Sequence, residues 1–182
     1  MIFGQETNSW CNECGDKSSF SNNIDKSISI YEKFYLNNGI KSYKGPFWNE
    51  FKRIKKEIKK HNNSSVIIWN NINKIGRIGK GNLDAINKIQ FENFMVIKDE
   101  IKILKPNIII FLTGTDYDFF IKNNLRDFKQ IEVSESLYNL DFVNNYSDIN
   151  FFKTYHPNAL YFMKKNKIVI PKLINEVLKK LN

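Results

Sequence analysis

The chain has 182 residues, of which 42% are hydrophobic and 14% aromatic, and it carries a formal net charge of +9. This composition excludes a disordered chain, and the length fits one domain over residues 1–182 with a core of its own. No apolar run is long enough to span a membrane and no signal-peptide pattern opens the chain, so we expect a cytoplasmic protein without a membrane partner. The positive charge suits a nucleic-acid partner, although a general abundance of Lys, Asn and Ile accounts for part of it.

The first third of the chain predicts one strand, a loop and two helices. Residues 1–3 are apolar and strand-like, and residues 8–27 are rich in Asn, Ser and Gly, as loops are. One helix is predicted over 29–36, and a second helix begins at Pro46. The core face of the second helix is predicted from helical spacing to be Trp48, Phe51, Ile54 and Ile58. The basic residues of 52–60 then face outward.

The two cysteines, Cys11 and Cys14, form one C-x-x-C pair in the predicted loop. A structural zinc site needs four ligands, and neither a second Cys pair nor a nearby His is available. A redox pair would be expected at the start of a helix that follows a strand. We therefore expect no metal and no cofactor.

The middle of the chain predicts a buried strand, a basic loop and a long helix. Residues 66–69 are continuously apolar, which is typical of a strand inside a parallel sheet. Residues 70–82 contain three Gly and three basic residues, but no Gly-Lys-Ser/Thr follows, so we interpret them as a flexible basic loop. Apolar residues at helical spacing from Ile86 to Leu104 predict one amphipathic helix that ends before Pro106.

The last part of the chain continues the alternation of strands and helices. Strands are predicted over 107–113, 130–133 and 151–155, with a helix over 116–123. The inward residues of a closing helix are predicted to be Leu173, Ile174, Val177, Leu178 and Leu181. This order predicts an α/β fold, a three-layer α/β/α sandwich around a central, mostly parallel four-stranded sheet.

Polar residues follow three of the predicted strands, where an open α/β sheet places its ligand. Gly-Gln-Glu-Thr-Asn at residues 4–8 follows the first strand, and Asn70 with Asn71 follows the second. His-Pro-Asn-Ala-Leu at residues 156–160 follows the last strand. A carboxylate, an amide and a histidine at one edge of the sheet predict an active site.

In order and spacing these motifs resemble the uracil-DNA glycosylase superfamily. Residues 4–8 are similar to its Gly-Gln-Asp-Pro-Tyr motif, and residues 67–70 to its second strand, which ends in a base-reading Asn. Residues 109–114 are similar to the strand and Gly that follow, and residues 156–160 to its His-Pro-Ser-Pro-Leu loop. The Trp-Asn-Asn strand end and the Gly-Gln-Glu-Thr-Asn start more closely resemble a little-characterised bacterial branch. The resemblance implies excision of uracil or another altered base from DNA.

The resemblance implies a role for each matching residue. Asn70 would read the O4 and N3–H of a pyrimidine, and backbone N–H groups around Gln5 would hold a base carbonyl. His156 would donate a hydrogen bond to the O2 of the base as negative charge develops there. Glu6 would orient water and stabilise the cationic sugar.

Further residues are expected to touch the DNA. An aromatic side chain must stack on the extruded base, and Phe20 lies at a suitable distance past the first motif, with Trp10 as its competitor. Leu160 matches the wedge that fills the place of the base, although it would be core if residues 159–163 begin a helix. The DNA-contacting residues are thus predicted to be Leu160, Asn158, Lys164 and Lys165.

The chain departs from the family pattern at several positions. Glu6 replaces the catalytic Asp and is one methylene longer, and Asn8 replaces the Tyr that excludes thymine, so uracil specificity is not carried over. The two cysteines are too few for the iron–sulfur branches. Because the chain begins inside its first strand, either the domain is minimal or the start is truncated.

Three functions remain open from the sequence. The first is a monomeric DNA glycosylase-like enzyme, and the alternative is a catalytically inactive glycosylase-fold protein that binds nucleic acid. The third, an enzyme acting on a free nucleoside or nucleotide, is disfavoured by the positive charge. For the basic clusters at 52–60 and 164–180, a solvated helix face and nucleic-acid contact are both open.

Overall fold

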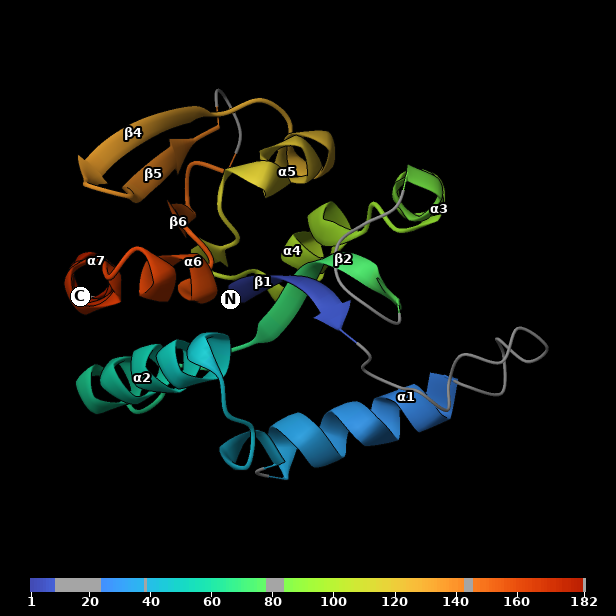
Figure 1. Ribbon diagram of the computed structural model, residues 1–182, viewed down its shortest axis with the longest axis horizontal. Helices are drawn as coiled ribbons and strands as arrows, with labels where there is room; N and C mark the ends of the chain where they lie inside the picture. The colour runs from blue at the N-terminus through green and yellow to red at the C-terminus, as the bar shows by residue number, and fades with distance from the viewer. Residues whose placement is uncertain (9–23, 38, 78–83, 143–145, 182) are drawn as a thin grey trace.

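The computed structural model describes residues 1–8, 24–37, 39–77, 84–142 and 146–181 (Figure 1). Six strands form one sheet in the order β2-β1-β3-β6-β5-β4. The strands are β1 (Ile2–Asn8), β2 (Trp69–Arg77), β3 (Ile108–Leu112), β4 (Lys129–Ser134), β5 (Leu137–Asp141) and β6 (Asn150–Thr154). The four neighbours from β2 to β6 run parallel, and β5 runs antiparallel to both β6 and β4.

Helices connect the strands and cover the sheet. The helical segments are α1 (Ile24–Tyr31), which continues as the π-helix η2 (Glu32–Leu36), the 3-10 turns η3 (Gly39–Lys41) and η4 (Thr115–Tyr117), α2 (Pro46–His61), α3 (Asp84–Asn93), α4 (Ile97–Leu104), α5 (Asp118–Leu125), α6 (Pro157–Phe162) and α7 (Asn166–Lys179). Among the described residues, none of these helices combines the length and apolarity that crossing a membrane requires.

Each face of the sheet is covered by its own hydrophobic core. The first core joins one face to α2, α6 and α7, and its members include Ile2, Ile110, Phe152, Ile54, Leu160 and Leu173. The second core joins the other face to α4 and α5, and its members include Phe3, Ile109, Phe111, Ile101 and Ile121. The predicted α/β class with a mostly parallel sheet is confirmed. The predicted number of four strands is wrong, because β5 and β4 also join the sheet beside the four parallel strands.

Two strands differ from their predicted bounds in a way that matters for the site. The strand predicted over 66–69 begins at Trp69 and continues to Arg77, and Val66 is 82% exposed. Likewise β1 continues through Gly4 to Asn8, and it pairs with β2 along this stretch. The polar residues that were expected to follow these strands therefore lie inside them.

The predicted helix from residue 86 to residue 104 is divided into α3 and α4. The backbone N–H of Ile97, at the start of α4, donates to the side-chain Oδ1 of Asn124 at 3.3 Å. At the end of α3, the side chain of Gln90 accepts from the backbone N–H of Lys74 and donates to the carbonyl of Phe94. These polar side chains satisfy backbone groups at the break, which helical periodicity in the sequence does not reveal.

One charged side chain lies almost wholly inside the fold, next to the second core. Lys153 in β6 is 1% exposed, and its ammonium forms an ion pair with the carboxylate of Asp118. The side-chain oxygen of Gln130 lies 3.3 Å from the same ammonium, and its amide nitrogen donates to Asp118 at 2.9 Å. Burial lowers the pKa of Lys153, while Asp118 opposes the shift. The pair ties β6 to the start of α5.

Candidate functional site

His156 lies at the carboxyl end of β6, at the position that caps the amino terminus of α6. Pro157 occupies the first turn of that helix, and the backbone N–H of Asn158 donates to the His156 Nδ1 at 3.2 Å. A neutral imidazole that accepts at Nδ1 carries its proton on Nε2. The cap therefore assigns Nε2–H as the donor that this ring offers to a ligand.

The His156 ring stacks on an aromatic side chain of α2. The centroids of His156 and Phe47 are 5.6 Å apart and the rings are 9° from parallel. Burial lowers the pKa of His156 to about 4. The imidazole is therefore neutral near pH 7, and it can donate a hydrogen bond without carrying a charge.

Gly4 permits the close approach of Phe47 to the sheet. A Cβ atom at Gly4 would lie 3.1 Å from the Phe47 ring and 2.6 Å from the Oδ1 of Asn71. Both neighbours thus occupy the space above Gly4 that a side chain would need. The absence of a side chain at Gly4 brings β1, β2 and α2 together beside His156.

Two buried amides lie on β2 in this region. Asn71 pairs with Gly4, and Asn73 pairs with Glu6, in the parallel register of β1 and β2. Asn71 is 6% exposed and Asn73 is 1% exposed. Among the described residues, neither the Oδ1 nor the Nδ2 of Asn73 has a hydrogen-bond partner. An unsatisfied buried amide costs roughly 1–3 kcal/mol, so a ligand that pairs with it would recover that free energy.

Asn70, the predicted base-reading residue, is committed to other contacts. Its Oδ1 accepts from the backbone N–H of Asn71 at 2.8 Å and from the ammonium of Lys74 at 2.9 Å. Lys74 is also paired with Glu100 of α4 at 2.8 Å. Because neighbouring residues in a strand point to opposite faces, Asn70 lies on the α4 side, whereas Asn71 lies on the side of Phe47 and His156. The side-chain oxygen of Asn70 is thus engaged within the protein, and its base-reading role stays a prediction.

Leu160 lies in the core, which was the alternative to its predicted role as a wedge. Leu160 has no exposed surface and belongs to the first core, because α6 turns it toward the sheet. Phe162, at the end of the same helix, is 91% exposed.

Asn158 is exposed and donates its backbone N–H to His156. Asn158 thus lies beside the His156 ring, and its contact with DNA stays a prediction.

The remaining predicted residues have different surroundings. The side-chain amide of Gln5 donates to the carbonyl of Thr113 at 2.7 Å, and its backbone lies within β1. Lys164 is exposed, and Lys165 forms an ion pair with Glu135 at 2.6 Å. That carboxylate raises the pKa of Lys165. Lys165 is therefore already partly neutralised within the protein.

Three predicted features are described only in part or not at all. Glu6 lies in β1 opposite Asn73, and this backbone position is what the structure describes of the residue. Phe20 and its competitor Trp10 lie outside the described residues, as does the Cys11 and Cys14 pair. Within the described part of the chain, no group of three or more His, Cys, Asp and Glu side chains could hold a metal ion.

The sequence interpretation missed Phe47, Asn71 and Asn73. Phe47 lies four residues before Phe51, on the apolar stripe of α2, and packs against the first core, so helical spacing could have included it. The burial of Trp69 assigns Asn71 and Asn73 to its own face by the two-residue period of a strand. Counting that period from Trp69 would have identified both amides.

No protein-family model, curated protein or solved structure matches this chain. The glycosylase resemblance therefore depends on the motifs alone, and the function of the site is argued from its own geometry.

Proposed function

We propose that this protein is a DNA glycosylase-like enzyme that accepts a flipped, altered base beside His156 and hydrolyses its N-glycosidic bond. The observation that carries the proposal is a neutral imidazole, held by Phe47 and by its cap hydrogen bond, at the same sheet edge as two buried amides. Such a site offers donors and acceptors to a heterocycle without a strong charge.

In the proposed reaction, the bond between C1′ and the base nitrogen breaks and its electron pair leaves on the base. The Nε2–H of His156 donates to the base oxygen on which negative charge develops, a hydrogen bond that strengthens in the transition state. The water oxygen adds to C1′, and a proton from the water balances the departing base. Glu6 remains the proposed residue that orients this water.

Recognition of the base is assigned to β2. A side-chain amide offers a donor and an acceptor about as far apart as a carbonyl and an adjacent N–H on a pyrimidine or an oxidised purine. In the described part of the chain Asn73 has no partner for either atom, and the Oδ1 of Asn71 lies over Gly4, as does the Phe47 ring. These amides replace Asn70 as the proposed base-reading residues. Phe47 replaces Phe20 as the described aromatic beside the base.

A nucleic-acid-binding protein without catalysis is the second candidate. The burial of Leu160 favours it, because the side chain expected to hold the duplex open is not accessible. In the catalytic candidate, Phe162 takes that role, since an apolar side chain must enter the stack and Phe162 is 91% exposed.

The test is release of a base from labelled oligonucleotides that carry uracil, hypoxanthine or xanthine, single-stranded and in duplex. We expect abasic sites with at least one substrate, and a loss of about 100-fold or more with His156→Ala. Glu6→Gln should also reduce the rate. Asp127→Asn makes the same kind of change as Glu6→Gln at a side chain that is 91% exposed, and it should act as the wild type.

The outcomes separate the two candidates. Undiminished base release by both His156→Ala and Glu6→Gln would refute the mechanism. Binding of the oligonucleotides without base release from any substrate would establish the second candidate instead.

A further inference from the structure

Two basic segments that are far apart in the sequence come together in the fold. Residues 46–61 form α2, and residues 164–180 include α7, and the two helices pack side by side over the first core (Figure 1). Together these segments contain twelve Lys and Arg residues and three Glu, which gives them a net charge of +9. The rest of the chain contains sixteen basic and sixteen acidic residues, so its charges cancel. The entire net charge of the protein is thus carried by one layer, which we name the basic helical face.

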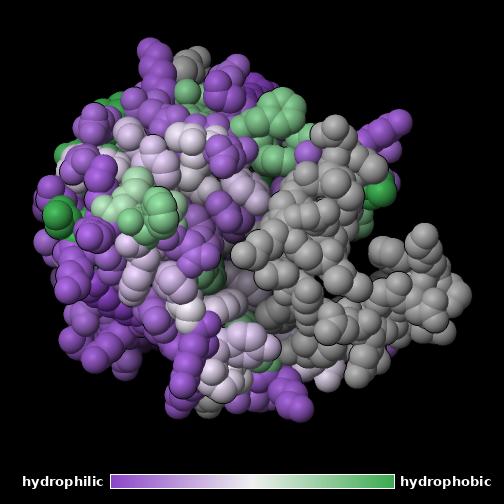
Figure 2. Space-filling view, in the orientation of Figure 1, coloured by the Kyte–Doolittle hydropathy of each residue, from purple (hydrophilic) through white to green (hydrophobic). Residues whose placement is uncertain are grey.

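The cations of this face outnumber its carboxylates, and most of them are exposed. Arg53, Lys56 and Lys60 lie on the exposed side of α2 at helical spacing, and Figure 2 shows mostly hydrophilic side chains over this part of the molecule, at the lower left. Its three carboxylates each have one partner on the face, in the pairs Glu50–Arg53, Glu57–Lys60 and Glu176–Lys179. In the described part of the chain, no carboxylate pairs with Lys56, Lys167 or Lys172.

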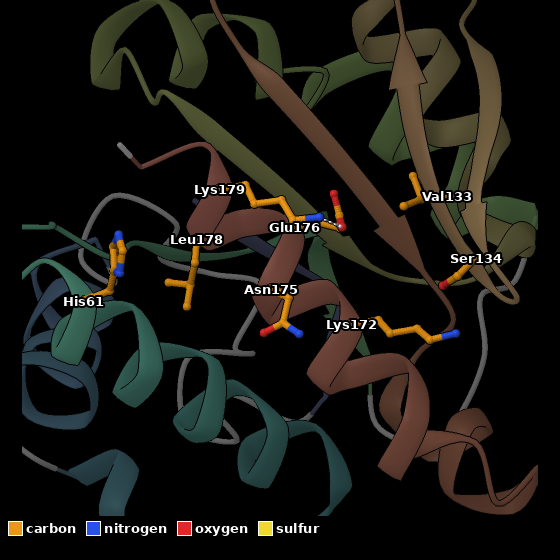
Figure 3. Close-up of a pocket in the computed structure, with 8 residues that line it drawn as sticks. All are labelled: His61, Val133, Ser134, Lys172, Asn175, Glu176, Leu178 and Lys179. Atoms are coloured by element: carbon orange, nitrogen blue, oxygen red, sulfur yellow. Dashed lines mark hydrogen bonds and ion pairs between the residues drawn. The ribbon is translucent and has the colours of Figure 1, made fainter.

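A groove of about 610 Å³ lies on this face between α7 and β4 (Figure 3). Lys172, Asn175 and Lys179 line it from α7, and Lys179 is paired there with Glu176. Ser134 lines it from β4, and His61 lies at its other end, at the end of α2. Ammonium, amide and hydroxyl groups in a concave track are the groups that contact phosphate oxygens.

We propose that the basic helical face binds the phosphate backbone of a nucleic-acid strand. The sixteen residues of α2 span about 24 Å, which corresponds to about seven nucleotides at 3.4 Å each. Both α2 and α6 begin at the site, with Phe47 and His156, so a strand along the face leads away from it. That direction rests on the proposed function, whereas the binding of phosphates does not.

A nucleic acid fits this face better than an anionic membrane surface. An interfacial helix inserts an apolar side between lipid headgroups. In α2 the apolar residues Phe51, Ile54 and Ile58 are buried against the sheet, and its exposed positions are polar. A concave, polar groove also suits a strand more than a flat bilayer.

The experiment measures binding of the full chain to unmodified, fluorescein-labelled oligonucleotides by anisotropy over a series of salt concentrations. The test protein carries Lys56→Gln, Lys167→Gln and Lys172→Gln, and the matched control carries Lys88→Gln, Lys98→Gln and Lys102→Gln on α3 and α4. Each variant loses three positive charges, and circular dichroism checks that both fold.

We expect the test variant to reduce the slope of log K against log salt by about 2 for a single strand, because each lost phosphate contact removes about 0.7. At 0.1 M salt this corresponds to binding that is weaker by about a hundredfold, if affinities converge near 1 M. The control variant should keep a slope close to that of the wild type.

Equal losses in the two variants would overturn the proposal, because bulk charge would then explain the binding. Stronger charge-dependent binding to phosphatidylserine vesicles than to oligonucleotides would also overturn it. Because the oligonucleotides contain no altered base, this result does not depend on catalysis. Loss of binding in the test variant, with no base release by the wild type, would retain the face and reject the glycosylase function.

Discussion

The buried ion pair of Lys153 and Asp118 allows a quantitative test of the fold beside the site. Asp118→Ala would leave the ammonium of Lys153, which is 1% exposed, with only the 3.3 Å contact to the oxygen of Gln130. Breaking a buried pair by removing one partner costs about 3–5 kcal/mol. For a domain of this size, that loss lowers the Tm by roughly 6–20 °C. The neighbouring Asp116 is exposed, so Asp116→Ala provides a matched control.

The assay is urea unfolding at pH 7, followed by circular dichroism, for the two single variants and for Asp118→Ala combined with Lys153→Met. The double variant should recover much of the loss, because an apolar side chain then replaces the unpaired charge. The Asp116→Ala protein should stay within about 0.5 kcal/mol of the wild type. A cost below about 1 kcal/mol for Asp118→Ala would show that water reaches the ammonium, and it would refute the burial argument.

The remaining predictions concern the site and α6. Gly4→Ala should cost about 1–3 kcal/mol in urea unfolding, because the new Cβ would meet a buried neighbour at 2.6 Å; unchanged stability would contradict the close packing over β1. Burial lowers the pKa of His156 from 6.5 to about 4, so the unfolded state binds more protons between these pH values. Stability should therefore fall by up to about 3 kcal/mol as the pH drops from 7 to 4, and His156→Asn should remove that part of the dependence. Asn73→Leu should leave the free protein as stable as before, or more so by about 1 kcal/mol, while abolishing base release; a large loss of stability would mean that the amide has a partner. Leu160→Ala should cost about 2–5 kcal/mol and Phe162→Ala less than about 0.5 kcal/mol in thermal unfolding, and the reverse order would contradict their burial.

Much of the fold was predictable because its signals are local. The apolar runs that became β3 and β6, the alternating residues of β4, and the apolar stripes of α2 and α7 follow the periods of their elements. The strand β5 was missed, since its sequence Leu-Tyr-Asn-Leu-Asp does not alternate and its pairing with β6 is what makes it a strand. The break between α3 and α4 depends on the side chain of Asn124, which lies in another helix.

The placement of the candidate site residues followed from the sequence only in part. The place of His156 at a strand end followed from the sequence, because an apolar strand and a Pro flank it. Whether Asn70 or Asn71 faces His156 depends on the register of β2. A shift of one residue would exchange the faces to which the two side chains point. The pairing of Trp69 with Ile2 of β1 determines that register, and the two strands are distant in the sequence.

The sequence by itself determined the α/β class, the basic character of the chain and the residue types available for chemistry, because composition and periodicity are properties of short segments. The tertiary structure decided which of these residues meet. It brought Phe47 onto His156, buried Leu160 and placed the two basic segments in one layer. Each of these results depends on packing between segments that are distant in the chain, where burial of apolar surface selects the arrangement.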